Sequence, residues 1–210
     1  MIKKHWKLLV ITSFVILLPM AVGLILWNQL PQQMPSHWNA AGEIDGWSSK
    51  PFSVFGMPLI LVAVHWLCAV ATASDPKKTN HSDKIMHLVF WIVLVLSVVL
   101  HAITYLAAMG KEVQVETVMP VLLGLVFAVL GNYLPKCKQS YTIGIKIPWT
   151  LNSEENWNKT HRLAGRLWLV CGIVMMVMGF FGGVGMVAGI ALVMVVVPIV
   201  YSYLLYREGV

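Results

Sequence analysis

Four ionisable side chains and two tryptophans lie within residues 37–50 of one short polar segment of the sequence, residues 27–51. They are His37, Glu43, Asp45, Lys50, Trp38 and Trp47. One imidazole and two carboxylates at these spacings fall short of a metal-site pattern, and no cofactor motif is present, so we predict neither a metal nor a cofactor. The ionisable side chains favour a surface that binds a ligand, whereas the tryptophans alone are typical of the aromatic belt at a membrane surface.

A second polar segment, residues 135–163, leads into a stripe of polar and aromatic residues. Its members are Glu154, Trp157, His161 and Trp168, which recur at intervals of 3, 4 and 7 residues and therefore share one face of a helix. An amphipathic helix on the inner leaflet accounts for the tryptophans. Glu154 and His161 on the same face favour a polar contact with another loop or with a cytosolic partner.

Turn and capping residues predict the local structure of both segments. In the first, Asn39 and the Asp45-Gly46 pair are typical of turns, so we expect a compact, hairpin-like element. In the second, residues 141–149 have an extended composition. We then expect Asn152 to cap a helix that carries Glu155 at its third position and that runs without a break into the following apolar run.

Two histidines, His65 and His101, lie within apolar runs that contain no acidic residue. Such a histidine more often donates one hydrogen bond to a helix carbonyl than relays protons. The absence of acidic residues from these runs disfavours a pump driven by protons or sodium. The sequence has no HExxH, GxSxG or phosphate-binding loop motif, and we therefore predict no enzyme and no catalytic residue.

The composition identifies the elements that must position these residues. Hydrophobic residues make up 58% of the 210 residues and charged residues only 11%, too few charges for a water-facing surface. Uncharged runs at 8–26, 52–73, 85–109 and 117–134 each match one bilayer crossing. The run 167–206 is long enough for two, with Gly179, Gly182, Gly183 and Gly185 at its turn. We predict an all-α, polytopic membrane protein with six transmembrane helices.

The net charge of +6 is explained by membrane topology. With both termini inside, all 15 Lys and Arg residues except Lys50 and Lys111 lie on the cytoplasmic side, as the positive-inside rule requires. The basic residues are scattered over four cytoplasmic segments, so we predict no direct nucleic-acid partner. Cys68, Cys137 and Cys171 fall on the reducing side and form no zinc-type cluster.

The two polar segments fall at comparable places in two halves, residues 1–110 and 111–210. The first opens with Asn28-Gln29-Leu30-Pro31, and the second follows Asn132-Tyr133-Leu134-Pro135. Three spans separate the halves, so a repeat would have the inverted topology found in many transporters. Coincidence is the competing explanation, because proline after a helix end is common.

Both segments resemble a known family. Residues of the first segment resemble the extracytoplasmic motif of DUF1648 membrane proteins: Pro31, Pro35, His37-Trp38-Asn39, Gly42, Asp45-Gly46-Trp47 and Lys50-Pro51. Residues of the second resemble the signature of the SdpI family: Gly144-Ile145-Lys146, Pro148-Trp149-Thr150-Leu151, Ser153-Glu154, Trp157, Thr160-His161 and Gly165. The two motifs in this order, with six spans, cover essentially the whole chain.

The resemblance implies a role in two parts, because the family is named for the immunity protein against the sporulation-delaying toxin of bacilli. That role is protection from a secreted peptide toxin and retention of a cytoplasmic repressor at the plasma membrane. The residues expected to meet the toxin outside the cell are His37, Trp38, Asn39, Asp45, Trp47 and Lys50. The residues expected to signal inside the cell are Lys146, Trp149, Thr150, Glu154, Trp157 and His161.

Two other functions remain open from the sequence. A transporter or exporter of a small molecule or peptide is favoured by the possible inverted repeat and disfavoured by the missing intramembrane acids. A regulatory or assembly partner without a small ligand is the third hypothesis. The sequence leaves the identity of the toxin and the oligomeric state undetermined.

Overall fold

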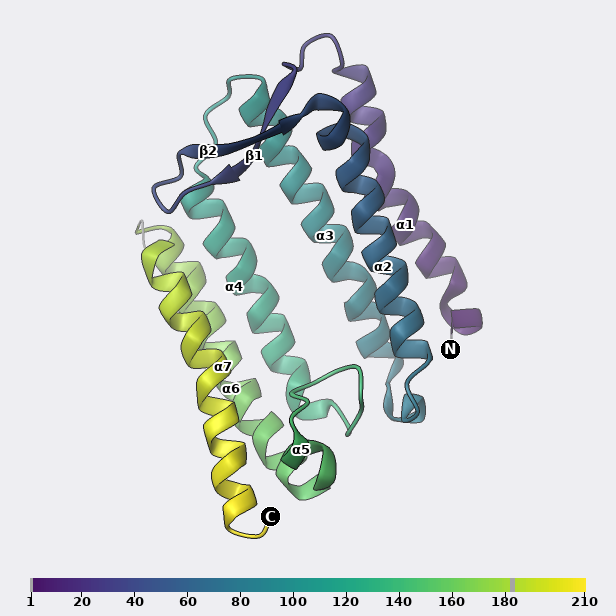
Figure 1. Cartoon of the computed structure of the whole chain (residues 1–210), viewed down its shortest axis with the longest axis vertical. Helices are drawn as coiled ribbons and strands as arrows, with labels where there is room; N and C mark the ends of the chain where they lie inside the picture. Colours follow the sequence, from purple (N-terminus) through teal and green to yellow (C-terminus); the bar gives the residue numbers. More distant parts are fainter. Residues whose placement is uncertain (1, 182–183) are drawn as a thin grey trace. The chain divides into compact units, whose positions relative to one another are not determined.

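The computed structural model describes residues 2–181 and 184–210, and most of them are helical (Figure 1). The long helices are α1 (Ile2–Ile25), α2 (Met57–Ala73), α3 (Asp83–Ala108), α4 (Val115–Tyr133), α6 (Glu154–Gly179) and α7 (Val184–Arg207). With the short turns that extend two of them, these six apolar helices are 22 to 26 residues long. Each can cross a bilayer, so the prediction of an all-α membrane protein with six spans is confirmed. Gly182 and Gly183, expected at the turn between the last two spans, lie outside the described residues.

The connections contain the smaller elements. They are the strands β1 (Gln33–Trp38) and β2 (Ile44–Ser49), the π-helical turn η1 (Phe52–Gly56), the 3-10 turns η2 (Lys78–Asn80) and η3 (Leu134–Lys136), and the short helix α5 (Pro148–Asn152). The strands pair antiparallel, which gives the first polar segment its hairpin. The second polar segment contains η3, α5 and the start of α6.

The chain divides into two compact units, Met1–Ala73 with Met86–Val115 and Ser74–Ile85 with Glu116–Val210. In the first unit α1, α2 and most of α3 lie together, and the hairpin lies at one end of them. Leu30, Met34, Val54 and Tyr105 form a buried cluster there, which fastens the base of the hairpin to the helices. The inverted repeat and the orientation with both termini inside stay predictions.

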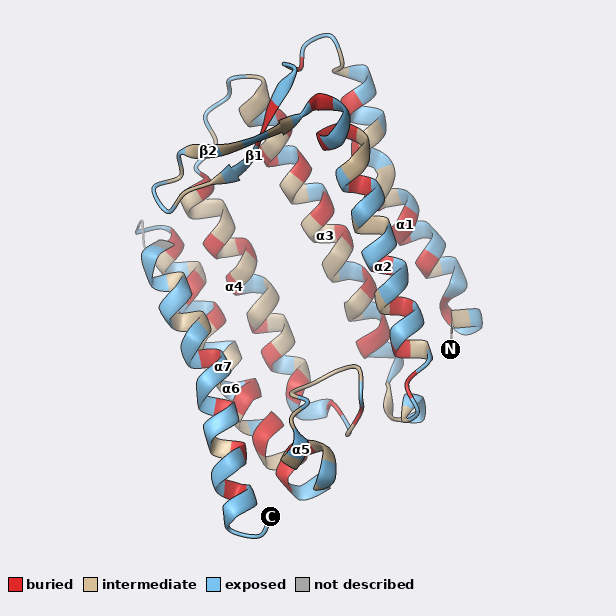
Figure 2. Ribbon diagram, viewed as in Figure 1, coloured by how far each residue is buried: buried red, intermediate tan, exposed pale blue. Residues whose placement is uncertain are grey.

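The long helices expose apolar side chains and bury polar ones, as a lipid-facing protein must. Figure 2 shows exposed positions recurring along the helices of each unit. Phe14, Leu67 and Leu192 expose 66%, 67% and 63% of their surface, whereas Thr12 and His65 are fully buried. Because a bilayer offers no hydrogen-bond partner, such polar groups are expected to pair with one another.

The polar groups of the first unit do pair across its helices. The Thr12 hydroxyl of α1 lies 2.8 Å from Nε2 of His65 in α2, and the indole of Trp66 donates to the Ser13 hydroxyl. Within α3, Nδ1 of His101 donates to the carbonyl of Ser97 over 2.7 Å. His65 therefore uses a hydroxyl of the neighbouring helix, and His101 uses a carbonyl of its own helix.

Glycines allow α4 and α6 of the second unit to approach closely. A Cβ atom on Gly131 would lie 2.5 Å from the backbone nitrogen of Leu169 and 2.8 Å from the carbonyl oxygen of Gly165. A Cβ atom on Gly124 would lie 2.5 Å from the carbonyl oxygen of Gly172. Any larger residue would push the two backbones apart, which is the usual reason for small residues between membrane helices.

The start of α6 differs from the predicted cap. Asn152 is the last residue of α5 and caps nothing; the hydroxyl of Ser153 accepts from the backbone N–H of Asn156 over 3.1 Å and caps α6. The preceding Pro148 begins α5, because proline suits the first turn of a helix, and this makes Trp149 helical instead of extended. Glu155 and Lys159, one helical turn apart on α6, form an ion pair at 2.8 Å.

Candidate functional site

The hairpin is held in shape by its own turn residues. The side-chain oxygen of Asn39 accepts from the backbone N–H groups of Ala41 and Glu43 over 2.9 and 3.1 Å. Gly42 has a φ of 79°, a conformation that favours glycine. Asn39 thus uses its amide to form the turn, which leaves less of it for a ligand.

Two of the predicted binding residues meet across the strands. Nδ1 of His37 in β1 lies 2.5 Å from the Asp45 carboxylate in β2. Gly46 lies opposite His37, where a Cβ atom would come within 2.7 Å of the Cβ of His37. The glycine is therefore required for the two strands to approach this closely. The His37 and Asp45 side chains are 71% and 44% exposed, so the pair is available to a ligand.

Lys50 joins the hairpin to the end of α1 instead of facing the solvent. Its ammonium donates to the carbonyl of Trp27 over 3.0 Å and lies 5.0 Å from the centre of the Trp27 ring. The residue is only 5% exposed. Because a buried cation needs such compensation, the main role of Lys50 is structural. Trp47, by contrast, is 57% exposed.

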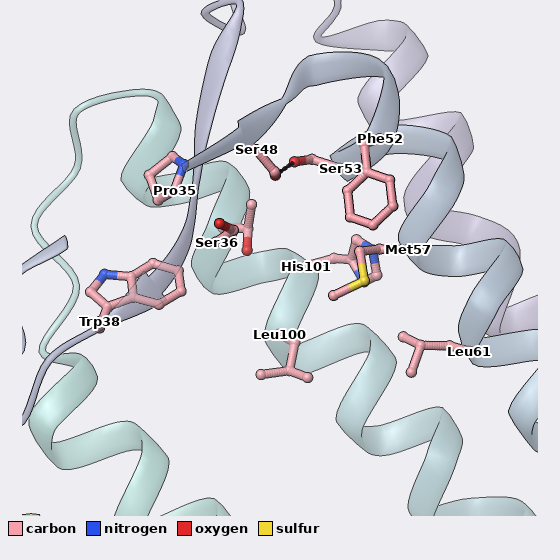
Figure 3. A pocket seen from close by; sticks show the side chains of 11 residues that line it. Pro35, Ser36, Trp38, Ser48, Phe52, Ser53, Met57, Leu61, Leu100 and His101 are labelled. Atoms are coloured by element: carbon pink, nitrogen blue, oxygen red, sulfur yellow. Dashed lines mark hydrogen bonds between the residues drawn. The ribbon is translucent and has the colours of Figure 1, made fainter. Parts of the chain in front are cut away.

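A cavity of about 140 Å³ lies between the hairpin and the helix ends of the first unit (Figure 3). Pro35, Ser36 and Trp38 line it from β1, and Leu100, His101 and Thr104 line it from α3. Phe52, Met57 and Leu61 complete the lining from η1 and α2. The Ser48 and Ser53 hydroxyls bond to each other at 2.6 Å, so this polar pair is already satisfied. Trp38 therefore faces a mostly apolar cavity.

In the second unit, His161 organises the segment before α5. Its Nδ1 donates to the carbonyl of Trp157, and its Nε2 accepts from the backbone N–H of Ile145, over 2.8 and 2.9 Å. Gly144 has a φ of 118°, and a Cβ atom there would lie 2.5 Å from Nε2 of His161. The indole of Trp157 stacks on the imidazole at 3.9 Å and donates to the carbonyl of Cys137 over 2.7 Å.

Asp75, between α2 and α3, fastens the 74–85 segment to residues 141 and 142. Its carboxylate accepts from the Tyr141 and Thr142 N–H groups over 3.0 and 2.9 Å and from the Thr142 hydroxyl over 2.7 Å. It also accepts from the Lys77 N–H and from the His81 ring, over 2.7 and 3.2 Å. Burial alone would raise the pKa of Asp75, but these hydrogen bonds lower it to about 2. We call this arrangement the Asp75 clasp.

Asn156 and Trp149 connect the same region to α7. The Asn156 amide donates to the carbonyl of Ser202 over 2.9 Å, and the Ser202 hydroxyl donates back over 2.5 Å. Trp149 lies 5.5 Å from the ring of Tyr203 and 6.0 Å from that of Tyr206. Its buried indole nitrogen has no partner in the described part of the chain.

The predicted residues thus fall into two groups. Those that present side chains to the surroundings are His37, Asp45, Trp47, Lys146 and Glu154. Those that hold the local structure are Asn39, Lys50, Thr150, Trp157 and His161; Thr150, for example, donates to the carbonyl of Ile145 over 2.8 Å. Trp38 lines the cavity, and Trp149 is half-buried. The stripe on α6 is therefore divided, with Glu154 exposed and His161 fully buried.

Sequence reasoning missed Asp75, Asn156 and the role of His101 in the cavity. Asp75 is a single acid in a short connection, and the partners that it fastens, Tyr141 and Thr142, lie more than 60 positions away, so no local spacing reveals it. Burial of a lone acid at a helix end is visible only once the chain is folded.

Over residues 2–181 and 184–210, no three His, Cys, Asp or Glu side chains are placed to hold a metal ion.

Comparison with known proteins confirms the resemblance stated from the two motifs. Residues 136–202 match the SdpI/YfhL protein family, and residues 14–62 match a domain of unknown function, DUF1648. The chain is 27% identical over 195 residues to the immunity protein SdpI of Bacillus subtilis (strain 168). The aligned residues make up 93% of this chain and 92% of that protein. No solved structure matches the chain. The six apolar helices and this similarity identify the chain as a multi-pass cell-membrane protein that is similar to SdpI.

Proposed function

We propose that this protein protects a bacterium from a secreted antimicrobial peptide and reports the peptide by holding a cytoplasmic repressor at the membrane. The observation that carries the proposal is the similarity to an immunity protein along 93% of the chain. The proposed role is binding and signalling, with no chemical step.

The hairpin and the cavity beside it are the proposed peptide-binding face. His37 and Asp45 form an exposed pair of hydrogen-bonding groups, and the exposed indole of Trp47 adds an apolar contact. A rigid hairpin loses little conformational freedom on binding, which favours affinity. Asn39 and Lys50 contribute by fixing the hairpin.

The segment from residue 136 to the start of α6 is the proposed signalling face. Lys146 and Glu154 are exposed, and the half-buried indole of Trp149 has an unused donor. The buried Trp157 and His161 hold the backbone of this segment in place through hydrogen bonds to Cys137 and Ile145. The Trp149 N–H is buried against Tyr203 and Tyr206, so a partner that supplies an acceptor would have to displace this packing and would then satisfy an unpaired donor.

A double substitution in the hairpin tests the binding face. In a toxin-sensitive bacterium challenged with the sporulation-delaying peptide, Asp45→Asn with Trp47→Ala should abolish the protection that the unchanged protein gives. The matched control is Glu43→Gln with Trp91→Ala, which removes an exposed acid of the hairpin turn and a half-exposed tryptophan of α3. Full protection by the first double variant, at equal membrane levels, contradicts the assignment.

The transporter hypothesis gives a different result in the same cells. An exporter lowers the amount of labelled peptide associated with the cells, whereas a binding protein raises it. Retention of labelled peptide on protected cells therefore supports the proposed role, and loss of peptide from them supports transport.

A further inference from the structure

The cavity beside the hairpin has the size of a single aromatic ring. Its volume is about 140 Å³, and an engineered apolar protein cavity of about 150 Å³ binds benzene. Most of its lining is apolar, with Phe52, Met57, Leu61 and Leu100 among the residues that form it. Such a cavity favours an apolar occupant over water, because water needs two or more polar partners.

His101 adds a specific polar requirement to this apolar lining. Its Nδ1 donates to the carbonyl of Ser97, and a carbonyl oxygen can only accept. In a neutral imidazole one nitrogen is the donor and the other the acceptor. Nε2 of His101 is therefore an acceptor, and it makes no hydrogen bond within residues 2–181 and 184–210.

The two observations together define the occupant. An unpaired acceptor that is desolvated by a ligand costs free energy unless the ligand supplies a donor. The occupant should thus combine an apolar group of about the size of one aromatic ring with one hydrogen-bond donor. Among the amino-acid side chains, the phenol of tyrosine meets both requirements, whereas the two-ring indole of tryptophan exceeds this size.

We propose that the cavity receives a tyrosine side chain of the peptide toxin, with its phenol donating to Nε2 of His101. This inference rests on the proposed function and specifies what the hairpin face recognises. The hairpin lines the cavity with Ser36 and Trp38, and the ring would anchor the peptide there. The exposed His37–Asp45 pair of the same hairpin offers further hydrogen-bonding groups outside the cavity.

Small probes test the cavity without the toxin. With the purified protein in lipid nanodiscs, ligand-detected NMR should show saturable binding of p-cresol, the side-chain analogue of tyrosine, above its partition into empty nanodiscs. Toluene, which has the ring without the hydroxyl, should bind roughly three- to tenfold more weakly, as expected for one hydrogen bond. Absence of saturable p-cresol binding, or equal binding of the two probes, overturns the proposal.

Substitutions locate the site. Leu100→Phe fills the cavity and should abolish p-cresol binding; Ser36→Leu fills it from the hairpin side if the first variant does not fold. Val98→Phe is the matched control, because Val98 and His101 line a separate crevice of about 220 Å³ between α1 and α3. His101→Phe should remove the preference for p-cresol over toluene. Binding that survives Leu100→Phe, or is lost in Val98→Phe alone, overturns the assignment.

Protection assays separate this inference from the proposed function. If p-cresol binds as expected but cells with Leu100→Phe stay fully protected, the cavity is no part of toxin recognition, and the inference fails while the immunity role stands. If the unchanged protein gives no protection, the immunity role fails, and the inference that rests on it fails with it.

Discussion

The Asp75 clasp offers a prediction whose magnitude follows from the structure. Asp75→Asn keeps the size of the side chain but replaces one carboxylate oxygen with an NH₂ group. That group would face donors, because the carboxylate now accepts from the N–H groups of Tyr141 and Thr142 and from the Thr142 hydroxyl. Asp75 is only 2% exposed. The substitution therefore leaves these donors without a hydrogen-bond partner in a buried region.

The lowered pKa sets the size of the effect. The pKa of Asp75 falls from 3.8 to about 2 because of the hydrogen bonds it accepts, which corresponds to about 2 kcal/mol of stabilisation of the charged form. A group with a lowered pKa stabilises the folded state above its unfolded pKa and loses that contribution as the pH falls through the folded value. The contribution of Asp75 should thus be complete above about pH 4 and lost towards pH 2.

Hydrogen exchange of the backbone amides measures this contribution locally. In Asp75→Asn the amides of Tyr141 and Thr142 should exchange roughly 30-fold faster than in the unchanged protein, the ratio that corresponds to about 2 kcal/mol. In the unchanged protein their protection should decline between pH 4 and pH 2, and in the variant that decline should be absent. Asp45→Asn, in the exposed hairpin, is the control and should leave both amides unaffected.

The result that refutes the reasoning is equally specific. If Asp75→Asn leaves the exchange of Tyr141 and Thr142 unchanged while the protein remains folded, the carboxylate does not hold the two segments together. If protection declines with pH in the variant as it does in the unchanged protein, the acid sensitivity belongs to a different group.

Three further predictions concern other residues of the same structure. Gly144→Ala should lower the thermal midpoint and cost about 2 kcal/mol, because a Cβ atom at φ 118° would lie 2.5 Å from Nε2 of His161; an unchanged midpoint would contradict the contact. Lys50→Met should make residues 33–49 more sensitive to protease, because the bond and ring contact to Trp27 are lost; equal cleavage rates would show that the hairpin does not depend on the cation. Burial raises the pKa of the Cys137 thiol to about 11, so its alkylation at pH 8 should be slow and should accelerate about tenfold for each pH unit up to about 11; a rapid reaction at pH 7 would contradict this.

The spans could be predicted from the sequence because lipid imposes one strong requirement, a long uncharged run, on each of them. The hairpin was similarly accessible, since Asn39, Gly42 and Asp45-Gly46 are local turn signals that need no tertiary contact. The start of α6 was misplaced by one residue, since Asn152 and Ser153 are both good capping residues. Pro148 decided between them by starting α5, which ends at Asn152.

The roles of individual site residues depend on contacts that no local pattern encodes. In the sequence, Lys50 is a cation in a polar loop, and nothing nearby indicates that it bonds to Trp27, 23 positions away. His161 and Glu154 share a helical face by spacing, but only the folded segment around Gly144 buries one of them and leaves the other exposed. The cavity is harder still to predict, because residues of β1, β2, η1, α2 and α3 must come together before it forms.

The glycine contact between α4 and α6 restricts how the second unit can move. Thr117, Gly124 and Gly131 recur every seven residues along α4, and they face Gly179, Gly172 and Gly165, which recur every seven residues along α6. To slide past each other, the helices would have to place a side chain where only backbone fits. The two helices are therefore held in one register. A displacement of α6 along its axis at the Trp157 end would reach the Gly179 end as well, because the helices cannot slide past each other.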